Sequence, residues 1–310
     1  MLNNKVRILN FDNSVTRQND FVARFRPVVV DLQKIASPAR IWLDRRTEKE
    51  IKSLFSLELM NAITFLGSGD FHHISSLLID QFIDPISVIV FDNHPDWDIL
   101  PPKTGCGSWV SRVLKKPNVQ QVILLGISSD DISTFNIQTG NLASLTDNRL
   151  EIYPYAHAAT RVFLRQVPEN RSLGLKKKMF NSNIYWQGLK DQQDLAQFSR
   201  QLLANLKTKQ VYVSIDKDCL KSGYALTNWE EGSLELEELL TILKVIKEHA
   251  DIVGLDITGE YSEVKIRNKV KSFCSRLDHP KNFSAKDKLL PLVDSINSQT
   301  NIRILELLKP

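Results

Sequence analysis

Short apolar runs alternate with longer amphipathic or polar stretches along most of the chain. Runs rich in Val, Ile and Leu predict buried strands, at residues 6–11, 63–66, 87–91, 121–126, 211–215 and 252–256. Amphipathic stretches predict helices at about 73–82, 108–114, 195–206 and 289–308. Ser233 is expected to cap a further helix that begins near Leu236. Strands that alternate with helices imply an α/β fold with a mostly parallel sheet covered on both faces.

Other segments have weaker patterns. Residues 27–31 and 39–43 are short strands or edge segments, and 47–53 is a charged helix or loop. Residues 136–183 give no clear pattern. The run Lys176-Lys177-Lys178 within them is typical of a solvated face, with anion binding as the alternative. We find no repeat or linker and expect a single α/β domain over residues 1–310.

Polar side chains follow the strand predicted at 87–91. Asp92, His94 and Asp96 come directly after it and alternate with residues that do not bind metals. In an extended segment, positions two apart point the same way, so these three side chains share one side. Open α/β sheets place their ligand sites at the carboxyl ends of strands. The pattern therefore predicts a metal site at this strand end.

Two more strands end in the same kind of residue. Asp216 and Asp218 follow the strand at 211–215, and His72 and His73 follow the strand at 63–66 and its Gly-rich turn. A single pair of Asp residues after a strand is more often a cap or a surface turn. Three such clusters from distant parts of the chain favour a metal site. Carboxylates with imidazoles suit a divalent ion, Mn²⁺ first, with Zn²⁺ and Fe²⁺ as alternatives.

These segments also match known motifs. Residues 92–96 match Asp-Ala-His-x-Asp, residues 214–218 match Ser-x-Asp-x-Asp, and residues 67–73 are a variant of Gly-Gly-Asp-His-Ser. From about Phe65 to Glu260 the sequence therefore resembles the ureohydrolase family, which contains arginase, agmatinase and their relatives. The resemblance implies the arginase-like three-layer α/β/α fold.

The same resemblance implies a binuclear metal centre. Asp92 and Asp216 would bridge the two ions. The two remaining pairs of ligands would be His72 with Asp96 on one ion, and His94 with Asp218 on the other. His73 is the alternative to His72, because Phe71 separates the motif aspartate from the histidines.

Two cations repel each other strongly unless anionic ligands lie between them, and four carboxylates offset that charge. A water shared by the ions can have its pKa lowered from 15.7 toward about 7, which gives hydroxide at neutral pH. The hydroxide would attack the planar carbon of a guanidinium, an amidine or an amide, so a small-molecule substrate is expected.

The sequence departs from the family at two candidate catalytic residues. Cys106 stands where relatives carry a proton-shuttling histidine; its thiol either transfers protons, with an unperturbed pKa near 8.5, or only packs. Glu260 resembles the glutamate that pairs with guanidinium in arginases, but its position is shifted by one residue relative to the family motif. Trp97, Trp109 and Trp229 either line an apolar pocket or belong to the core.

Three functions remain open. The first is a binuclear metal-dependent hydrolase of a non-peptide C–N bond, and the extra carboxylates Asp96 and Asp218 favour it. The second is a mononuclear zinc amide hydrolase, similar to deacetylases, that uses Asp92, His94 and Asp216. The third is a catalytically silent relative that binds a ligand, which the missing shuttle histidine suggests.

Composition limits the partners and the cellular location that we expect. The chain of 310 residues is 42% hydrophobic and 25% charged, which is ordinary for a globular protein. Its net charge of +4 is small and predicts no nucleic-acid partner. Three widely spaced cysteines, no signal-peptide pattern and no apolar run of ~20 residues predict a cytoplasmic protein without a membrane partner. A homo-oligomer is expected only because relatives often assemble as trimers or hexamers.

Overall fold

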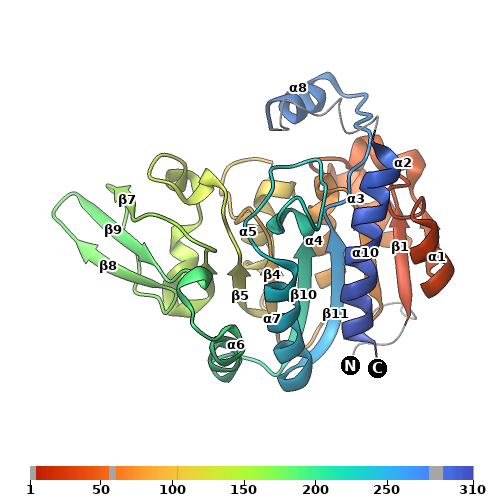
Figure 1. Ribbon diagram of the computed structural model, residues 1–310. Helices are drawn as coiled ribbons and strands as arrows, with labels where there is room; N and C mark the ends of the chain where they lie inside the picture. The colour runs from red at the N-terminus through yellow and green to blue at the C-terminus, as the bar shows by residue number, and fades with distance from the viewer. Residues whose placement is uncertain (1–4, 56–60, 103, 279–288, 310) are drawn as a thin grey trace.

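The computed structural model describes residues 5–55, 61–102, 104–278 and 289–309. Within these residues the main sheet has eight strands in the order β2-β1-β3-β11-β10-β4-β5-β6, and all neighbouring strands are parallel (Figure 1). The strands are β1 Val6–Asn10, β2 Val28–Asp31, β3 Ile63–Gly67, β4 Ile86–Phe91, β5 Val119–Leu125, β6 Leu150–Tyr153, β10 Gln210–Asp216 and β11 Asp251–Thr258.

Helices cover both faces of this sheet. The α-helices are α1 Asn19–Phe25, α2 Gln33–Ala39, α3 Arg45–Ser53, α4 Ser75–Ile79, α5 Trp109–Val113, α6 Leu195–Ala204, α7 Leu236–His249, α8 Lys269–Asp278 and α10 Leu290–Leu308. The 3₁₀ helices are η2 Gly69–Ile74, η3 Cys106–Ser108, η4 Asp130–Ile132, η5 Asn136–Thr139, η6 Leu142–Asn148, η7 Leu189–Asp191 and η8 Lys217–Cys219.

Two hydrophobic cores lie on opposite faces of the sheet. Along β4, Val88 and Val90 belong to the core that α3, α4 and α5 complete, whereas Ile89 and Phe91 belong to the core of α1, α6, α7 and α10. Successive strand residues point to opposite faces, so a strand buried on both faces is a continuous apolar run. The three-layer α/β/α fold predicted from the sequence is confirmed.

A second, smaller sheet projects from the main body. Strands β7 Thr160–Phe163, β8 Leu173–Lys177 and β9 Asn181–Trp186 pair antiparallel in the order β7-β9-β8. We call residues 160–186 the arm; it extends to the left in Figure 1. It packs into the first core through five buried side chains: Val162, Val167, Leu173, Ile184 and Trp186.

Some predicted elements differ in the structure. Helix α7 has Glu235 rather than Ser233 at its N-cap, because the Glu235 backbone N–H donates to the Glu238 carboxylate at 2.8 Å in a capping box. Residues 39–43 form no strand, and Trp42 makes only an isolated bridge to Gly105. The helix expected at 73–82 begins earlier and divides into η2 and the short α4. Residues 136–183, whose sequence gave no clear pattern, contain β6, β7, β8 and the start of β9.

Strand order brings distant sequence segments together. Strands β3, β11, β10 and β4 are consecutive neighbours, so their carboxyl ends meet at one edge of the sheet. The three predicted ligand clusters follow β3, β4 and β10. In the described part of the chain, no helix combines the length and apolar character needed to cross a bilayer.

Candidate metal centre

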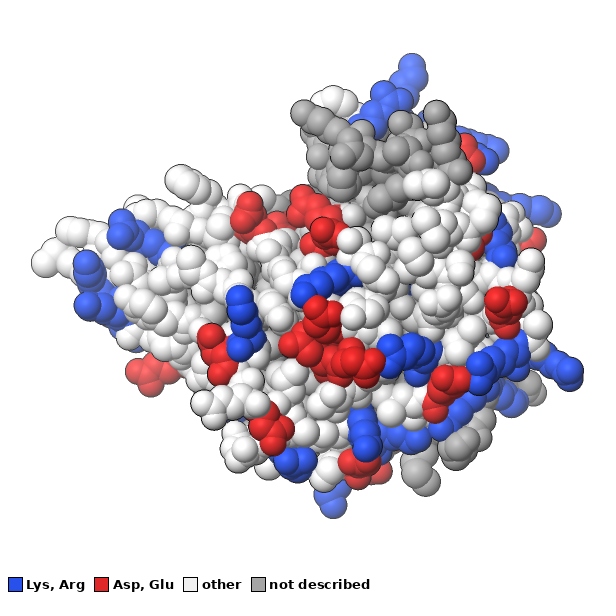
Figure 2. All heavy atoms as spheres, in the orientation of Figure 1, with Lys and Arg blue, Asp and Glu red and all other residues white. Residues whose placement is uncertain are grey.

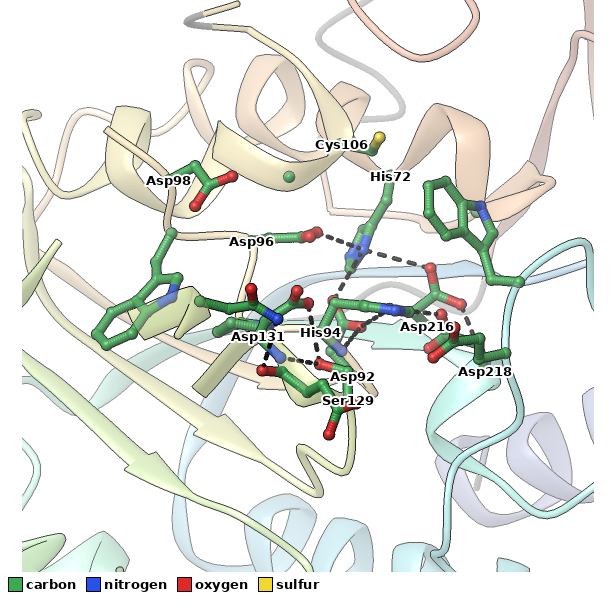
Figure 3. A pocket seen from close by; sticks show the side chains of 18 residues that line it. His72, Asp92, His94, Asp96, Asp98, Cys106, Ser129, Asp131, Asp216 and Asp218 are labelled. Carbon is green, nitrogen blue, oxygen red and sulfur yellow. Dashed lines mark hydrogen bonds and ion pairs between the residues drawn. The ribbon is translucent and has the colours of Figure 1, made fainter. Parts of the chain in front are cut away.

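A cavity of about 410 Å³ opens at the carboxyl ends of these central strands (Figure 3). All six residues predicted as metal ligands line it: His72, Asp92, His94, Asp96, Asp216 and Asp218. They come from η2, from the segment after β4, and from the end of β10 with η8. The structure thus brings together side chains that are far apart in the sequence.

The first group of side chains surrounds His72. Its Nδ1 atom lies 3.2 Å from Asp92 Oδ2, 3.3 Å from Asp96 Oδ2 and 3.4 Å from Asp216 Oδ2. Ligand atoms of His72, Asp92 and Asp216 all lie within 4.8 Å of one another, as one ion would require.

A second group shares Asp92 with the first. Its other members are His94 and Asp218, and His94 Nδ1 lies 3.1 Å from Asp218 Oδ2 and 3.8 Å from Asp92 Oδ1. Backbone donors orient both carboxylates: His94 N–H donates to Asp92 Oδ1 at 2.7 Å, and Asn93 N–H to Asp218 Oδ1 at 3.1 Å. Because its two oxygens face different groups, Asp92 has the geometry of a bridging ligand.

A hydrogen-bond chain orients the His72 ring. Ser214 Oγ donates to Asp256 Oδ1 at 2.7 Å, and Tyr212 OH donates to Asp256 Oδ2 at 2.5 Å. The Ser214 oxygen therefore accepts from His72 Nε2, 2.9 Å away. With Nε2 as the donor to Ser214, Nδ1 faces three carboxylates, which is the orientation that a metal-binding imidazole would need.

The electrostatics of the cluster favour added positive charge. Burial, with the charges of Asp96 and Asp218, raises the pKa of Asp92 well above its usual value. Burial and Asp218 raise the pKa of Asp216 to about 8. Asp92 Oδ2 is buried and accepts no well-directed hydrogen bond. Buried carboxylates that repel one another and have spare lone pairs fit divalent cations.

Glycine at position 259 leaves space for the Asp216 carboxylate. Gly259 has φ +85°, and a Cβ atom there would lie 2.4 Å from Asp216 Oδ1 and 2.5 Å from the Lys217 backbone nitrogen. Any side chain would displace Asp216. The end of β11 thus supports the ligands at the end of β10.

The three tryptophans divide between two positions. Trp97 and Trp229 line the cavity. Trp109 is fully buried behind it, where its Nε1–H donates to Asp96 Oδ2 at 2.7 Å and its ring lies 4.8 Å from the His72 ring. Trp109 therefore orients a predicted ligand and does not line the cavity.

The geometry favours His72 over His73. The His73 ring is buried outside the cavity, and neither ring nitrogen has a hydrogen-bond partner. Burial lowers the pKa of His73 to about 3, so the ring is neutral. His73 is therefore placed as a packing side chain.

The two candidate catalytic residues lie in different places. Cys106, at the start of η3, lines the cavity, so the predicted proton-transfer role stays a prediction. Glu260 does not line it. Its carboxylate is buried and accepts from Lys217 Nζ at 2.5 Å, Asn301 Nδ2 at 2.7 Å and Gln18 Nε2 at 2.9 Å. This position does not favour a direct substrate contact.

Further acidic residues that we did not predict line the outer cavity: Asp98, Asp130, Asp131 and Glu230. Burial, Asp131 and Asp96 raise the pKa of Asp98, although Thr139 Oγ1 donates to it. Two of these residues, Asp130 and Asp131, follow β5, the neighbour of β4 in the sheet. Their position directly after a predicted strand could have identified them as candidate site residues.

The sequence profile of the arginase family matches residues 156–264, which include Asp216 and Asp218. The solved arginase of Bacillus subtilis superposes with a TM-score of 0.56, covers 99% of this chain and 98% of that one, and is 11% identical, so it shows the fold. In this segment and in its fold, the chain is similar to members of the arginase family.

Two curated proteins give the sequence relationship. The chain is 28% identical over 211 residues to an uncharacterized protein of Thermotoga maritima, across 68% of this chain and 62% of that protein. It is 40% identical over 80 residues to arginase 2, chloroplastic/mitochondrial, of Arabidopsis thaliana, across 23% of this chain and 22% of the enzyme. Each match spans less than two thirds of the relative's length.

Proposed function

We propose that this protein is a hydrolase of the ureohydrolase type that cleaves a non-peptide C–N bond of a guanidino or amidino compound. The observation that carries the proposal is the pair of ligand groups, His72 with Asp92 and Asp216, and Asp92 with His94 and Asp218. Asp96 Oδ2, 3.3 Å from His72 Nδ1, adds a further carboxylate to the first group.

These residues would hold two divalent cations, with Mn²⁺ as the first choice and Zn²⁺ or Fe²⁺ as alternatives. When bound, such cations supply the positive charge that lets a water molecule act as a nucleophile at neutral pH. Asp92 and Asp216 would lie between the cations and reduce their repulsion. The Ser214–Asp256 chain keeps the His72 lone pair directed at the site.

The charge of the cavity supports a cationic substrate. Eight of the described lining residues are Asp or Glu, and none of them is Lys or Arg. Four of the eight belong to the ligand cluster. The other four, Asp98, Asp130, Asp131 and Glu230, face the outer cavity and would attract the positive charge of a guanidinium or amidinium group.

Cys106 and the tryptophans would act on the substrate directly. Trp97 and Trp229 offer ring surface to a flat cationic group. Cys106 lies on the cavity wall, where its thiol could pass a proton to the leaving amine.

The mononuclear zinc alternative has less geometric support. It requires Asp92, His94 and Asp216 around one ion, and among the described residues this set does not form one of the compact ligand groups. The amide substrate that it would favour is neutral and would gain little from the acidic outer cavity.

The test is a substrate screen with protein stripped of metal and reloaded with Mn²⁺. Guanidino, amidino, formimino and acetylamino compounds are incubated with the wild type and with Asp92→Asn, and urea, ammonia and acetate are measured. We expect urea or ammonia from a cationic compound, and none from Asp92→Asn. Asp84→Asn is the matched control and should keep full activity, because this exposed carboxylate precedes the amino end of β4 whereas the ligands follow its carboxyl end.

Two results would count against the proposal. Acetate release as the only activity, with zinc retained, would support the mononuclear amide hydrolase. Elemental analysis that finds at most one tightly held divalent ion after Mn²⁺ loading would exclude the binuclear centre.

A further inference from the structure

The arm carries the net positive charge of the protein. Between residues 160 and 186, six side chains are Lys or Arg and one is Glu, a net charge of +5, whereas the whole chain has +4. The remainder of the chain is therefore slightly acidic. Figure 2 shows Lys and Arg side chains along the arm at the left, next to uncharged side chains at its end.

The tip of the arm exposes large apolar side chains. Leu164 is 87% exposed, Met179 88%, Phe180 67% and Phe163 43%. They come from two neighbouring segments, because the Leu164 N–H donates to the Phe180 carbonyl at 3.3 Å. We call these four residues the tip. Four adjacent large apolar side chains on a projecting sheet form a contact surface rather than a scatter of single exposed residues.

Exposed cations surround the tip. Lys176, Lys177 and Lys178 are exposed on β8 and the turn that follows it, and Lys178 precedes Met179 directly. Arg161 is exposed on β7. We call these four residues the basic collar.

The other two cations of the arm, Arg165 and Arg171, already have partners. Arg165 donates to the carbonyls of Gln138 and Gly140, and Arg171 pairs with Glu151 at 2.5 Å. These contacts hold the arm to the body of the protein. The basic collar is thus the part of the arm's charge that faces outward near the tip.

We propose that the arm docks on an anionic lipid surface, with the tip inserted among the acyl chains and the basic collar on the lipid phosphates. Apolar side chains gain by leaving water for the interfacial region, and nearby cations add attraction to anionic lipids. Neither effect needs a membrane-spanning helix. The expected absence of a membrane partner rested on the lack of an apolar run long enough to span a bilayer, which does not bear on docking.

Two features disfavour other occupants of this surface. A second copy of the chain would bring an arm with the same charge of +5, so tip-to-tip association is repulsive. A nucleic acid would satisfy the basic collar, but Leu164 and Met179 have no ring on which a base could stack. The acyl region of a bilayer suits both the aliphatic and the aromatic tip residues.

The experiment is co-sedimentation of the full chain with vesicles. Phosphatidylcholine vesicles containing about 30% phosphatidylserine are compared with pure phosphatidylcholine at about 0.15 M salt. We expect at least about tenfold tighter binding to the anionic vesicles, weakened by added salt.

Two variants separate the roles of the tip and the collar. Leu164→Ser with Met179→Ser and Phe180→Ser should abolish sedimentation. Replacing Lys176, Lys177 and Lys178 by Ala should weaken binding on the order of a hundredfold, from about fivefold for each cation. All these side chains are exposed, so melting temperatures should match the wild type.

Matched surface variants elsewhere serve as controls. Ile83→Ser removes an apolar side chain that is 91% exposed outside the arm. Lys34→Ala with Lys115→Ala and Lys209→Ala removes three exposed cations outside it. Both should bind vesicles like the wild type.

Four outcomes would overturn the proposal. The first two are equal binding to neutral and anionic vesicles, and unchanged vesicle binding by the tip variant. The third is self-association of the protein, seen by light scattering, that the tip variant abolishes. The fourth is tighter binding to single-stranded RNA than to the anionic vesicles.

Discussion

Two clusters of buried charge meet where β10 ends, and they differ in how their charges are balanced. Asp216 and Asp218 line the cavity, whereas Lys217 between them is buried outside it and pairs with Glu260 at 2.5 Å. Asn301 and Gln18 donate to the same Glu260 carboxylate. We call Lys217, Glu260, Gln18 and Asn301 the inner cluster.

The protein balances the inner cluster by itself, because one cation and neutral donors satisfy its one carboxylate. The cavity cluster combines four carboxylates with two imidazoles, and no Lys or Arg lines the described cavity. A buried charge is stable only when it is paired or neutralised, so the second cluster must take up protons or, as we propose, divalent cations. Adjacent residues at the end of β10 therefore belong to two clusters whose charges are balanced in different ways.

The largest expected effect breaks the cavity cluster. Asp92→Asn keeps the acceptor for the His94 N–H but removes the charge shared by both ligand groups. We expect a loss of activity of about a thousandfold or more, together with loss of bound metal by elemental analysis.

The same variant tests whether the cavity cluster is unbalanced without cations. Because Asp92→Asn relieves repulsion, the metal-free variant should melt at the wild-type temperature or above it. Added Mn²⁺ should raise the melting temperature of the wild type and leave that of the variant unchanged. A metal-free variant that melts well below the wild type would show that Asp92 is structural.

The next effect breaks the inner cluster. Lys217→Met leaves the Glu260 carboxylate buried without its cation, and we expect the free energy of unfolding to fall by about 3–5 kcal/mol. Adding Glu260→Leu removes the stranded charge and should recover most of the loss. Denaturant unfolding in the presence of a chelator measures both without a metal contribution.

A surface pair provides the control for this prediction. Lys244 Nζ lies 3.9 Å from Glu248 Oε1 on the exposed face of α7. Lys244→Met should change the free energy of unfolding by no more than about 0.5 kcal/mol. If Lys217→Met costs no more than Lys244→Met, the inner cluster does not stabilise the fold.

A smaller effect distinguishes the outer carboxylates from the ligands. Asp131 lines the cavity and accepts from Ser129 Oγ at 2.9 Å. Asp131→Asn should raise KM for a cationic substrate about fivefold, as expected for a partly exposed ion pair, with kcat and metal content little changed. The same rise for a neutral analogue would contradict the electrostatic role.

The smallest effect concerns a third buried charge, Lys271, which donates hydrogen bonds to neutral carbonyl groups. Lys271 Nζ donates to the carbonyls of Pro38, Arg40 and Trp42, at 2.7, 3.2 and 2.5 Å. Burial lowers its pKa from 10.5 to about 8. Between about pH 8 and 10.5 the unfolded chain therefore binds more protons at this position, and its contribution to stability rises with pH.

Lys271→Met should remove that rise. The measurement is the difference in unfolding midpoint between wild type and variant at pH 8, 9 and 10, which cancels the other titrating groups. We expect the wild-type midpoint to rise relative to the variant midpoint between pH 8 and pH 10. A wild-type midpoint that falls relative to that of the variant would contradict the lowered pKa.

Most of the fold was predictable because its strands are buried on both faces. Such strands are continuous apolar runs, and the runs at 87–91, 211–215 and 252–256 correspond to β4, β10 and β11. The arm was not predictable, since its strands are half-exposed and mix Lys, Gly and Asn with apolar residues.

The sequence by itself determined the type and direction of the ligands. The alternation of Asp92, His94 and Asp96 after a strand, and of Asp216 and Asp218 after another, places each set on one side of its own segment. This follows from backbone geometry alone and needs no knowledge of neighbouring strands.

Only the tertiary structure decided which groups meet. The order β3-β11-β10-β4-β5 brings His72 to Asp216 and Asp131 to the same cavity, and it buries Glu260 against Lys217. These contacts join residues from distant parts of the chain, and their distances depend on how strands pair and helices pack. Spacing along the chain carries no record of those distances, so the side chains that surround each buried charge were decided by packing.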